Sequence, residues 1–218
     1  MIDQPHLDTL MEGAHTLGIS LSDDTISSLI IYLETLRRWS KTTDLVSQPA
    51  PHVVIHKHIL DSLAVSPALA PACRFIDLGS GAGFPGLILA MAGRKREATL
   101  LEPRRKRANF LKDVARLAHL KNVTVYESRA ESGAKEQDLR ESFDVAMTRA
   151  TWDIKTFLSF AWPFLKKDGT ALAMKGKKGE QELLNYKANP GPQFCFSKRH
   201  DYTLPAGQEE RYVYEFSK

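Results

Sequence analysis

A glycine-rich segment, Phe75–Gly86, sets the strongest limit on the fold of this chain. It reads Phe-Ile-Asp-Leu-Gly-Ser-Gly-Ala-Gly-Phe-Pro-Gly and is followed by an apolar stretch that ends at Gly93. Glycines let the backbone turn sharply and approach a ligand closely, and a helix that follows such a turn offers free N–H groups. The segment therefore predicts a strand, a ligand-binding loop and a helix in succession.

Strand-like and helix-like runs alternate along the chain after this point. A helix is clearest over Arg105–Leu120, and another is predicted near Glu180–Tyr186. Strand–helix alternation is typical of a parallel sheet covered on both faces. The last two strand-like runs are separated by a turn alone, which predicts an antiparallel hairpin at the sheet edge. The strand-like runs are Phe75–Leu78, Ala98–Leu101, Val123–Tyr126, Val145–Thr148, Thr170–Met174, Phe194–Tyr202 and Arg211–Phe216.

The first seventy residues predict helices without strands. Apolar residues recur at helical spacing over Leu7–Leu17 and Ile26–Trp39, and a third helix is predicted over His52–Ala64. The fold class is thus α/β with a helical addition. We expect an N-terminal helical extension over residues 1–70 and the α/β domain over residues 71–218.

Composition and charge exclude several protein classes. The 218 residues are 43% apolar and 26% charged, which is enough apolar surface for a core and argues against wholesale disorder. No apolar run approaches the ~18 residues of a membrane-spanning helix. The N-terminal residues carry neither a basic run nor an apolar segment of the signal-peptide kind. We therefore expect a cytoplasmic protein with no membrane partner, acting as a monomer.

The cysteines and histidines do not follow the spacing of metal or disulfide sites. Cys73 and Cys195 lie far apart and form no Cys-x-x-Cys pair, which predicts two reduced, buried thiols. His52, His56 and His58 have no His-Glu-x-x-His motif or cysteine partner, so we interpret them as surface or capping residues. The sequence predicts no metal site.

Two nucleotide cofactors compete for the glycine loop. The Gly-x-Gly-x-x-Gly pattern at positions 81–86, with Glu102 some 20 positions on, satisfies the dinucleotide fingerprint of nicotinamide or flavin oxidoreductases. A carboxylate at Asp77 would repel a pyrophosphate, but it suits the ammonium and sulfonium groups of S-adenosylmethionine. Glu102 can accept hydrogen bonds from both ribose hydroxyls of either cofactor. Asp77, Gly79, Gly81 and Glu102 therefore predict S-adenosylmethionine, with a dinucleotide oxidoreductase as the alternative.

Basic residues gather in several short runs although the formal net charge is only +4. Such clusters favour a polyanionic partner, because each contact with a phosphate adds long-range attraction. A solubilising surface is the other interpretation of the same pattern. The runs are Arg94–Arg96, Arg104–Arg107, Lys166–Lys167, Lys175–Lys178 and Lys198–Arg199.

Together with the glycine loop, five further motifs resemble the RsmG (GidB) methyltransferases, which modify guanine N7 in 16S ribosomal RNA. The resemblance implies a Rossmann-like class I methyltransferase sheet, S-adenosylmethionine as methyl donor, and 16S ribosomal RNA or the small ribosomal subunit as partner. The Gly-Ala-Gly-Phe-Pro-Gly core of the loop is specific, because Phe and Pro are unusual at these places in methyltransferase loops. The further motifs are His58–Leu63, Lys106–Leu111, Arg129–Glu131, Thr148–Ala150 and Lys175–Gly176.

The resemblance also implies which residues contact the cofactor. Ala130 and Glu131 follow the third strand, where a loop can cover the adenine edge, and Phe84 is expected in the pocket wall. Arg149 follows the fourth strand, at the sheet edge where α/β folds bind ligands, and could hold the methionine carboxylate or a target phosphate. The implied contacts are Gly79, Phe84, Glu102, Ala130, Glu131 and Arg149.

The sequence gives weaker evidence for residues that contact RNA than for residues that contact the cofactor. We expect Arg105 and Arg107 to belong to an RNA-binding surface, and Lys175 at the end of the fifth strand to be a further RNA contact. Trp152 could stack on a base or lie in the core. The chain departs from the family pattern at Ser40, Asp44 and Val46, where Asn, Asn and Thr are usual, and at Pro103 after Glu102.

Guanine N7 carries an exposed lone pair and no proton, so its methylation needs no general base. Catalysis then comes mostly from orientation of donor and acceptor, and no catalytic residue is predicted. Three functional classes remain open at this point: an RNA methyltransferase, a dinucleotide oxidoreductase, and a methyltransferase that acts on a small molecule or a protein.

Overall fold

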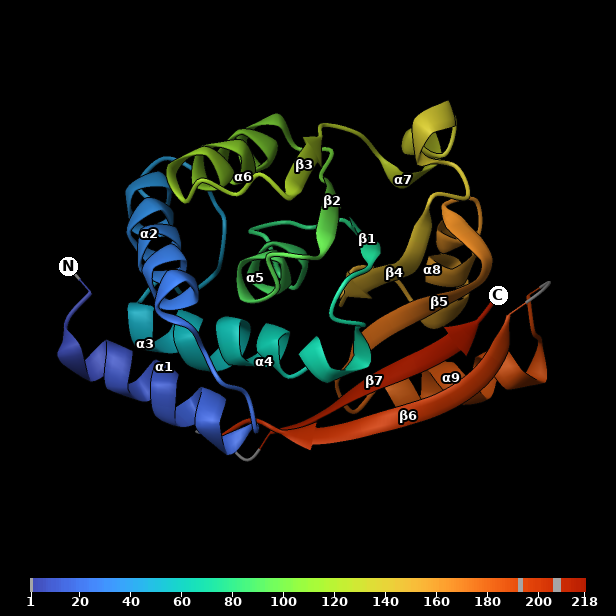
Figure 1. Ribbon diagram of the computed structural model, residues 1–218. Coiled ribbons are helices and arrows are strands. Elements are labelled where there is room, and N and C mark those ends of the chain that lie inside the picture. The colour runs from blue at the N-terminus through green and yellow to red at the C-terminus, as the bar shows by residue number, and fades with distance from the viewer. Residues whose placement is uncertain (1, 192–193, 206–208) are drawn as a thin grey trace.

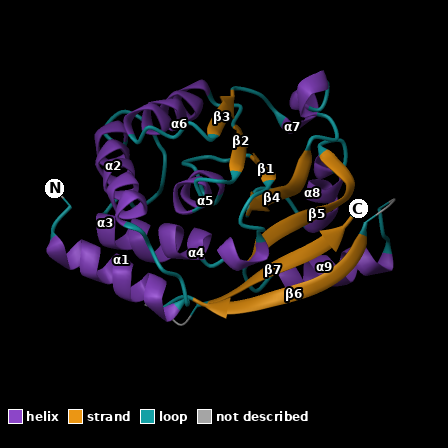
Figure 2. Ribbon diagram, viewed as in Figure 1, coloured by secondary structure: helices purple, strands orange, loops and turns teal. Residues whose placement is uncertain are grey.

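The computed structural model describes residues 2–191, 194–205 and 209–218, and a seven-stranded sheet forms its centre (Figures 1 and 2). The strand order is β3-β2-β1-β4-β5-β7-β6, with β1 to β5 parallel and β7 antiparallel to both β5 and β6. This confirms the predicted α/β class and the antiparallel C-terminal hairpin. The strands are β1 (Arg74–Leu78), β2 (Glu97–Leu101), β3 (Val123–Tyr126), β4 (Phe143–Arg149), β5 (Leu165–Lys175), β6 (Cys195–Thr203) and β7 (Glu210–Ser217).

Helices cover the sheet on both sides (Figure 1). The predicted helix over residues 52–64 forms as α3, a π turn at Ile55–Ile59 and α4 in direct succession. The α-helices are α1 (Gln4–Thr16), α2 (Asp23–Trp39), α3 (Pro51–Val54), α4 (Leu60–Leu63), α5 (Gly86–Ala92), α6 (Arg105–Leu117), α7 (Ala130–Gly133), α8 (Ile154–Ala161) and α9 (Gly179–Ala188).

Two hydrophobic cores lie on opposite faces of the sheet because side chains alternate along each strand. Phe75 of β1 points into one core, which α1, α2, α4, α5 and α6 complete with residues such as Leu33 and Leu87. Its neighbour Ile76 points into the other core, which is completed by α8 and α9 with residues such as Phe157. The N-terminal helices therefore share a core with the sheet, and the domain boundary at residue 70 stays a prediction.

Local sequence explains where α2 begins. The backbone N–H of Thr25 donates to the Ser22 hydroxyl at 3.3 Å, which caps the helix, and Asp23 and Asp24 lie in the first turn, where the helix dipole favours negative charge. The helix then buries Leu29, Leu33 and Leu36 in the core that it shares with α5 and α6. The cap matters for the site because α2 carries Tyr32, which contacts the glycine loop.

The prediction of two buried thiols is wrong for one of them. Cys73 is buried, whereas Cys195 is exposed. Cys195 begins β6, which lies at the edge of the sheet and whose side chains are all exposed or half-buried. In the described part of the chain, no helix is long and apolar enough to cross a membrane.

Candidate functional site

The glycine loop leaves β1 in a conformation that non-glycine residues rarely adopt. Gly79, Gly81 and Gly83 have φ of +72°, +58° and +95°. The N–H groups of Gly79 and Ser80 donate to the carbonyl oxygen of Leu101 at 2.9 and 3.0 Å, which anchors the loop at the carboxyl end of β2. The backbone is therefore open to a ligand at the edge where parallel strands end.

Side chains from distant segments brace this loop. The hydroxyl of Tyr32, on α2, donates to the carbonyl oxygen of Ala82 at 2.8 Å, and the Tyr32 ring packs edge-on against Phe84. From β4, the Thr148 hydroxyl donates to the carbonyl oxygen of Leu78 at 3.0 Å. Both hydroxyls are fully buried, so the N-terminal helices and the sheet fix the loop together.

Asp77 lies completely buried beneath the loop. Its Oδ2 accepts a hydrogen bond from the Gly86 N–H at 3.0 Å, while its Oδ1 has no hydrogen-bond partner among the described residues. Burial raises the pKa of Asp77 to about 6, against the opposing effect of the Gly86 N–H. The loop thus covers a carboxylate of which only one oxygen accepts a hydrogen bond from the described residues.

Gly86 is a position where even a methyl group has no room. A Cβ there would lie 2.6 Å from Leu100 Cδ2 and 2.7 Å from both Cβ and Oδ2 of Asp77. We expect Gly86→Ala to lower the free energy of unfolding by about 1–3 kcal/mol, the usual cost of overpacking, as measured by urea unfolding. Gly191→Ala, whose Cβ would meet only Tyr186 at 4.0 Å, is the control and should be nearly neutral. Equal midpoints for both variants would refute the tight packing.

Four of the predicted cofactor residues line one cavity of about 310 Å³, named here the Glu102 cavity. They are Gly79 from the loop, Glu102 after β2, and Ala130 and Glu131 at the start of α7. The complete lining is Gly79, Glu102, Pro103, Arg104, Arg107, Ser128, Arg129, Ala130, Glu131, Thr151 and Trp152. Thr151 and Trp152 were not predicted as cofactor contacts, although they follow the strand end that carries Arg149.

Glu102 ties two loops together inside this cavity. Its Oε2 accepts from the Gly81 N–H and its Oε1 from the Arg104 N–H, both at 2.8 Å, and the residue is 3% exposed. Each carboxylate oxygen can accept more than one hydrogen bond. The two oxygens are therefore fixed in place and keep capacity for hydroxyl groups of a ligand.

A second cavity of about 440 Å³, named here the Arg149 cavity, is lined by residues at the ends of β4 and β5 and by residues around Asp61. Arg149 and Ala150 line this cavity, whereas the next two residues line the Glu102 cavity. Ala150 has φ of +55°, a conformation that costs energy outside glycine and that clusters at functional sites. The lining is Lys57, His58, Asp61, Arg149, Ala150, Met174, Lys175, Gly176, Tyr202 and Arg211.

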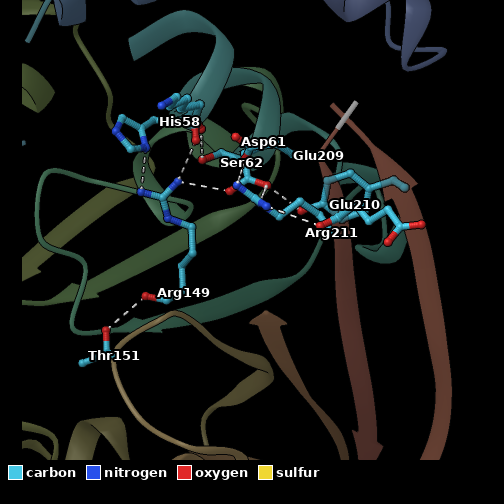
Figure 3. Close-up of polar contacts among 10 residues, drawn as sticks. His58, Asp61, Ser62, Arg149, Thr151, Glu209, Glu210 and Arg211 are labelled. Carbon is cyan, nitrogen blue, oxygen red and sulfur yellow. Dashed lines mark hydrogen bonds and ion pairs between the residues drawn. The ribbon is translucent and has the colours of Figure 1, made fainter. Parts of the chain in front are cut away.

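Contacts on several sides orient the Arg149 guanidinium (Figure 3). Nη1 donates to Asp61 Oδ2 at 3.2 Å, Nη2 lies 3.1 Å from His58 Nδ1, and the guanidinium carbon lies 4.8 Å from the Phe84 ring centre. Burial and the neighbouring Arg149 cation lower the pKa of His58 to about 4, so its imidazole is neutral near pH 7 and accepts at Nδ1. Arg149 is thus held rigidly at the carboxyl end of β4.

The other four predicted cofactor residues do not line the Glu102 cavity. Arg149 faces the second cavity, not the one that contains Glu102. Phe84 is 5% exposed, packs between Tyr32 and His58, and supports Arg149 from below instead of lining either cavity. Asp77 and Gly81 are also not among the lining residues of the Glu102 cavity: the Gly81 N–H donates to Glu102, and Asp77 accepts from the Gly86 N–H.

The side chains predicted to contact RNA differ in their exposure to solvent and in their pairing with other residues. Arg105 is exposed at the start of α6, and Arg107 is partly exposed and donates to the Asp44 carbonyl oxygen at 3.0 Å. The Lys175 side chain is 6% exposed, because its ammonium pairs with Glu182 at 2.9 Å and donates to the Trp152 carbonyl oxygen. Lys175 therefore holds the segment after β4 in place.

The sequence analysis did not predict a functional role for three residues of the Arg149 cavity, namely Asp61, Tyr202 and Arg211. Asp61, which is 4% exposed, joins Arg149, Tyr202 and Arg211 across large separations in the chain. No short-range pattern marks such a cluster, and only the His58–Leu63 motif pointed to this part of the helix. Within the described residues, no group of three or more His, Cys, Asp or Glu side chains is placed to hold a metal ion.

Comparison with known proteins agrees with this geometry. Residues 25–211 match the GidB family model, described as rRNA small subunit methyltransferase G. The curated ribosomal RNA small subunit methyltransferase G of Aeromonas salmonicida is 37% identical over 91% of this chain and 91% of its own length. The protein of that name from Clostridium botulinum (strain Eklund 17B) is 36% identical over 81% of this chain and 74% of its own.

Solved structures show the same fold at low sequence identity. The structure of M. jannaschii TYW2 in complex with AdoMet superposes with a TM-score of 0.53 at 15% identity, covering 73% of this chain and 74% of that one. This likeness concerns the Rossmann-like methyltransferase fold. The match over residues 25–211 and the identities above 30% show the family: this chain belongs to the GidB family of small-subunit ribosomal RNA methyltransferases.

Proposed function

We propose that this chain transfers the methyl group of S-adenosylmethionine to N7 of a guanine in 16S ribosomal RNA. The observation that carries the proposal is the Glu102 cavity, in which a fixed carboxylate lies beside a glycine loop that covers the buried Asp77. The family is one of ribosomal RNA methyltransferases. The proposal places the reaction in the cytoplasm, with 16S ribosomal RNA or the small ribosomal subunit as partner.

The residues present fit S-adenosylmethionine. Asp77 Oδ1, which is buried and has no hydrogen-bond partner in the part of the chain that the structure describes, gives the loop a negative potential that suits an ammonium or sulfonium group and opposes a pyrophosphate. Glu102 would hold the ribose hydroxyls, and Ala130 and Glu131 would contact the adenine edge. A Cβ on Gly79 would lie 3.3 Å from Thr151, so only glycine leaves the loop open there. When bound, the cofactor supplies an electrophilic methyl group.

The chain's own residues supply orientation. Adjacent residues of one segment line the two cavities, Arg149 and Ala150 the one and Thr151 and Trp152 the other, so a base on the Arg149 side would lie near a donor on the Glu102 side. His58 is neutral and its Nδ1 accepts from Arg149, so it holds the guanidinium and takes no proton from the substrate. This suits an acceptor atom that has a lone pair and no proton, as guanine N7 does.

The pKa of Asp77 predicts a pH dependence of cofactor binding. The pKa of Asp77 is about 6 in the folded protein and ~3.9 in unfolded chains, so the folded protein binds more protons than the unfolded chain between these pH values. Protonated Asp77 therefore stabilises the fold at low pH, and this stabilisation is lost as pH rises through 6. A cationic ligand favours the ionised carboxylate. We expect affinity for S-adenosylmethionine to rise up to about tenfold from pH 5 to pH 7, with proton release on binding below pH 6. Calorimetry in buffers of different ionisation enthalpy measures both.

Asp77→Asn is the control for that experiment. Asparagine keeps an oxygen that can accept from the Gly86 N–H and does not titrate. The variant should bind S-adenosylmethionine more weakly at pH 7 and with a flat pH profile. A wild-type slope in the variant would show that another group controls the pH dependence.

The exposed start of α6 predicts a salt-dependent RNA contact. We expect the double variant Arg105→Glu, Arg107→Glu to weaken RNA binding and to reduce the slope of log K against log salt by up to about two, since each lost phosphate contact removes ~0.7–0.9. Filter binding of 16S ribosomal RNA at several salt concentrations measures the slope. Lys155→Glu, at an exposed position of α8, is the matched control. An unchanged slope in the double variant would reject this surface.

Calorimetry with S-adenosylmethionine and with NAD distinguishes the methyltransferase from the oxidoreductase. We expect the chain to bind the first and to give no heat with the second. Transfer of a tritiated methyl group to RNA, to small subunits or to protein then separates an RNA methyltransferase from one that acts on other acceptors. Tight binding of NAD without S-adenosylmethionine binding would overturn the proposal.

A further inference from the structure

Trp152 places an indole ring in the wall of the Glu102 cavity, next to the glycine loop. Its ring atom Cη2 would lie 3.4 Å from a Cβ built on Gly79, so the edge of the ring reaches the first glycine of the loop. The residue is half-buried, which leaves part of its side chain accessible. An aromatic surface therefore lies beside the backbone that carries the predicted cofactor contacts.

Several contacts hold Trp152 in this position. Phe160, on α8, packs edge-on against the indole, with the ring centroids 5.2 Å apart. The Trp152 carbonyl oxygen accepts from the ammonium of Lys175, which pairs with Glu182 at 2.9 Å. Glu182 also accepts from the Ile154 N–H at 3.1 Å. Residues of β5, α8 and α9 thus fix the ring before a ligand binds, so that little ordering is left for the binding step.

The segment after β4 carries two features that cost free energy. Ala150 has φ of +55°, and the side chain of Lys175, which is 6% exposed, keeps a charge away from water. Strain of this kind clusters at functional sites, where the surrounding structure enforces it. Both features serve to place residues 151 and 152 at the cavity wall.

The Trp152 ring has no cationic neighbour of its own within the described ranges. Arg149 lies over the Phe84 ring at 4.8 Å and Lys218 over the Trp162 ring at 4.4 Å, whereas no Lys or Arg described here lies over the ring of Trp152. The face of an indole attracts cations, because it carries the negative part of the ring quadrupole. The ring therefore keeps this capacity for a cation that a ligand brings.

The proposed cofactor brings such a cation. Glu102 would hold its ribose, and Ala130 and Glu131 would contact its adenine edge, which leaves the sulfonium part to the Gly79 side of the same cavity. The Trp152 ring edge reaches Gly79. Once the methyl group has left, the sulfonium is a neutral thioether. A contact between a cation and this ring would thus exist for the methyl donor and not for its product.

We propose that the Trp152 ring packs against the sulfonium of S-adenosylmethionine and makes the Glu102 cavity prefer the methyl donor over the product S-adenosylhomocysteine. The inference rests on the proposed function and adds a residue that distinguishes the two states of the cofactor. The preference favours exchange of the product for a new donor after each transfer.

Calorimetry at pH 7 with three ligands tests the preference for charge. S-adenosylmethionine and sinefungin are cationic at the relevant position, where sinefungin has an ammonium group, and S-adenosylhomocysteine is neutral there. We expect Trp152→Leu to raise Kd about tenfold for the two cationic ligands and less than about threefold for the neutral one. Trp162→Leu, which changes a half-buried tryptophan outside the cavity, is the matched control.

Trp152→Phe tests the same point with less disturbance of the packing. Its ring can still pack against Phe160, so this variant remains informative if Trp152→Leu does not fold. The rise in Kd for the cationic ligands should lie between those of wild type and Trp152→Leu, because a phenyl ring attracts cations less strongly than an indole.

Intrinsic fluorescence gives a second readout that does not depend on activity. The chain has three tryptophans, of which Trp39 and Trp162 do not line the Glu102 cavity. We expect saturating S-adenosylmethionine to quench the fluorescence of wild type, Trp39→Phe and Trp162→Phe, and to leave that of Trp152→Phe nearly unchanged. S-adenosylhomocysteine should quench wild type less than the donor does.

The outcomes separate this inference from the proposed function. Equal rises in Kd for all three ligands in Trp152→Leu would show that the ring only packs, and a raised KM for RNA with unchanged Kd would assign the ring to the target base. Either result overturns the inference while the methyltransferase stands. If wild type binds no S-adenosylmethionine, or binds it and methylates no RNA, the proposed function itself fails.

Discussion

Glu102→Gln is expected to weaken binding of S-adenosylmethionine by roughly 100-fold or more. The carboxylate is 3% exposed and its two oxygens are fixed by the N–H groups of Gly81 and Arg104. Hydrogen bonds to a charged partner contribute ~1.5–3 kcal/mol each, so the loss of charge toward two ribose hydroxyls corresponds to at least two orders of magnitude in Kd. Calorimetry at pH 7 measures the change.

The same substitution should have a small effect on the fold. A glutamine amide nitrogen cannot accept a hydrogen bond, so one loop N–H loses its partner, at about 1 kcal/mol of unfolding free energy. Glu127→Gln is the matched control, since Glu127 is exposed and does not line the cavity. Wild-type affinity in Glu102→Gln would remove Glu102 from the cofactor site.

Arg149→Met is expected to destabilise the protein by roughly 3 kcal/mol, a large part of the stability of a typical domain. The variant leaves the Asp61 carboxylate, whose side chain is 6% exposed, with Tyr202 as its remaining close partner and Arg211 at 3.7 Å. An uncompensated buried charge is the main cost, and the contact with the Phe84 ring is lost as well. Urea unfolding at pH 7 gives the free energy.

A double-mutant cycle separates the charge from the packing. Asp61→Asn removes the stranded carboxylate, so combining it with Arg149→Met should recover much of the lost stability. The control is Arg38→Met, which breaks an ion pair with Asp113 of 2.8 Å whose arginine is 61% exposed and should cost under about 1 kcal/mol. Equal costs for Arg149→Met and Arg38→Met would show that the buried network contributes little.

The fold could be predicted because its signals are local. Several strands, such as β1 and β2, coincide with a short apolar run bounded by turns or helices, and the glycine loop marks the end of β1. The hairpin followed from two strand-like runs with only a turn between them. Four residues of the Glu102 cavity were predictable for the same reason, since Gly79, Glu102 and the Ala130–Glu131 pair each follow a strand of one parallel sheet and so meet at one edge.

The second cavity could not be predicted because no local pattern encodes it. Asp61 and Tyr202 are 141 positions apart, and their contact depends on how the C-terminal hairpin crosses α4. The burial of Lys175 could not be predicted either, because it depends on an ion pair with Glu182 of the next helix. Tertiary contacts therefore decide which strand-end cations stay free and which become part of the scaffold.

The most direct measurement is nucleoside analysis of the product. The purified chain is incubated with S-adenosylmethionine and small-subunit ribosomal RNA from cells that lack its activity, and the RNA is then digested and examined by mass spectrometry. We predict that N7-methylguanosine appears with the wild-type chain and is nearly absent with Glu102→Gln. Methylation at another atom or base, or none despite bound S-adenosylmethionine, would contradict the assignment.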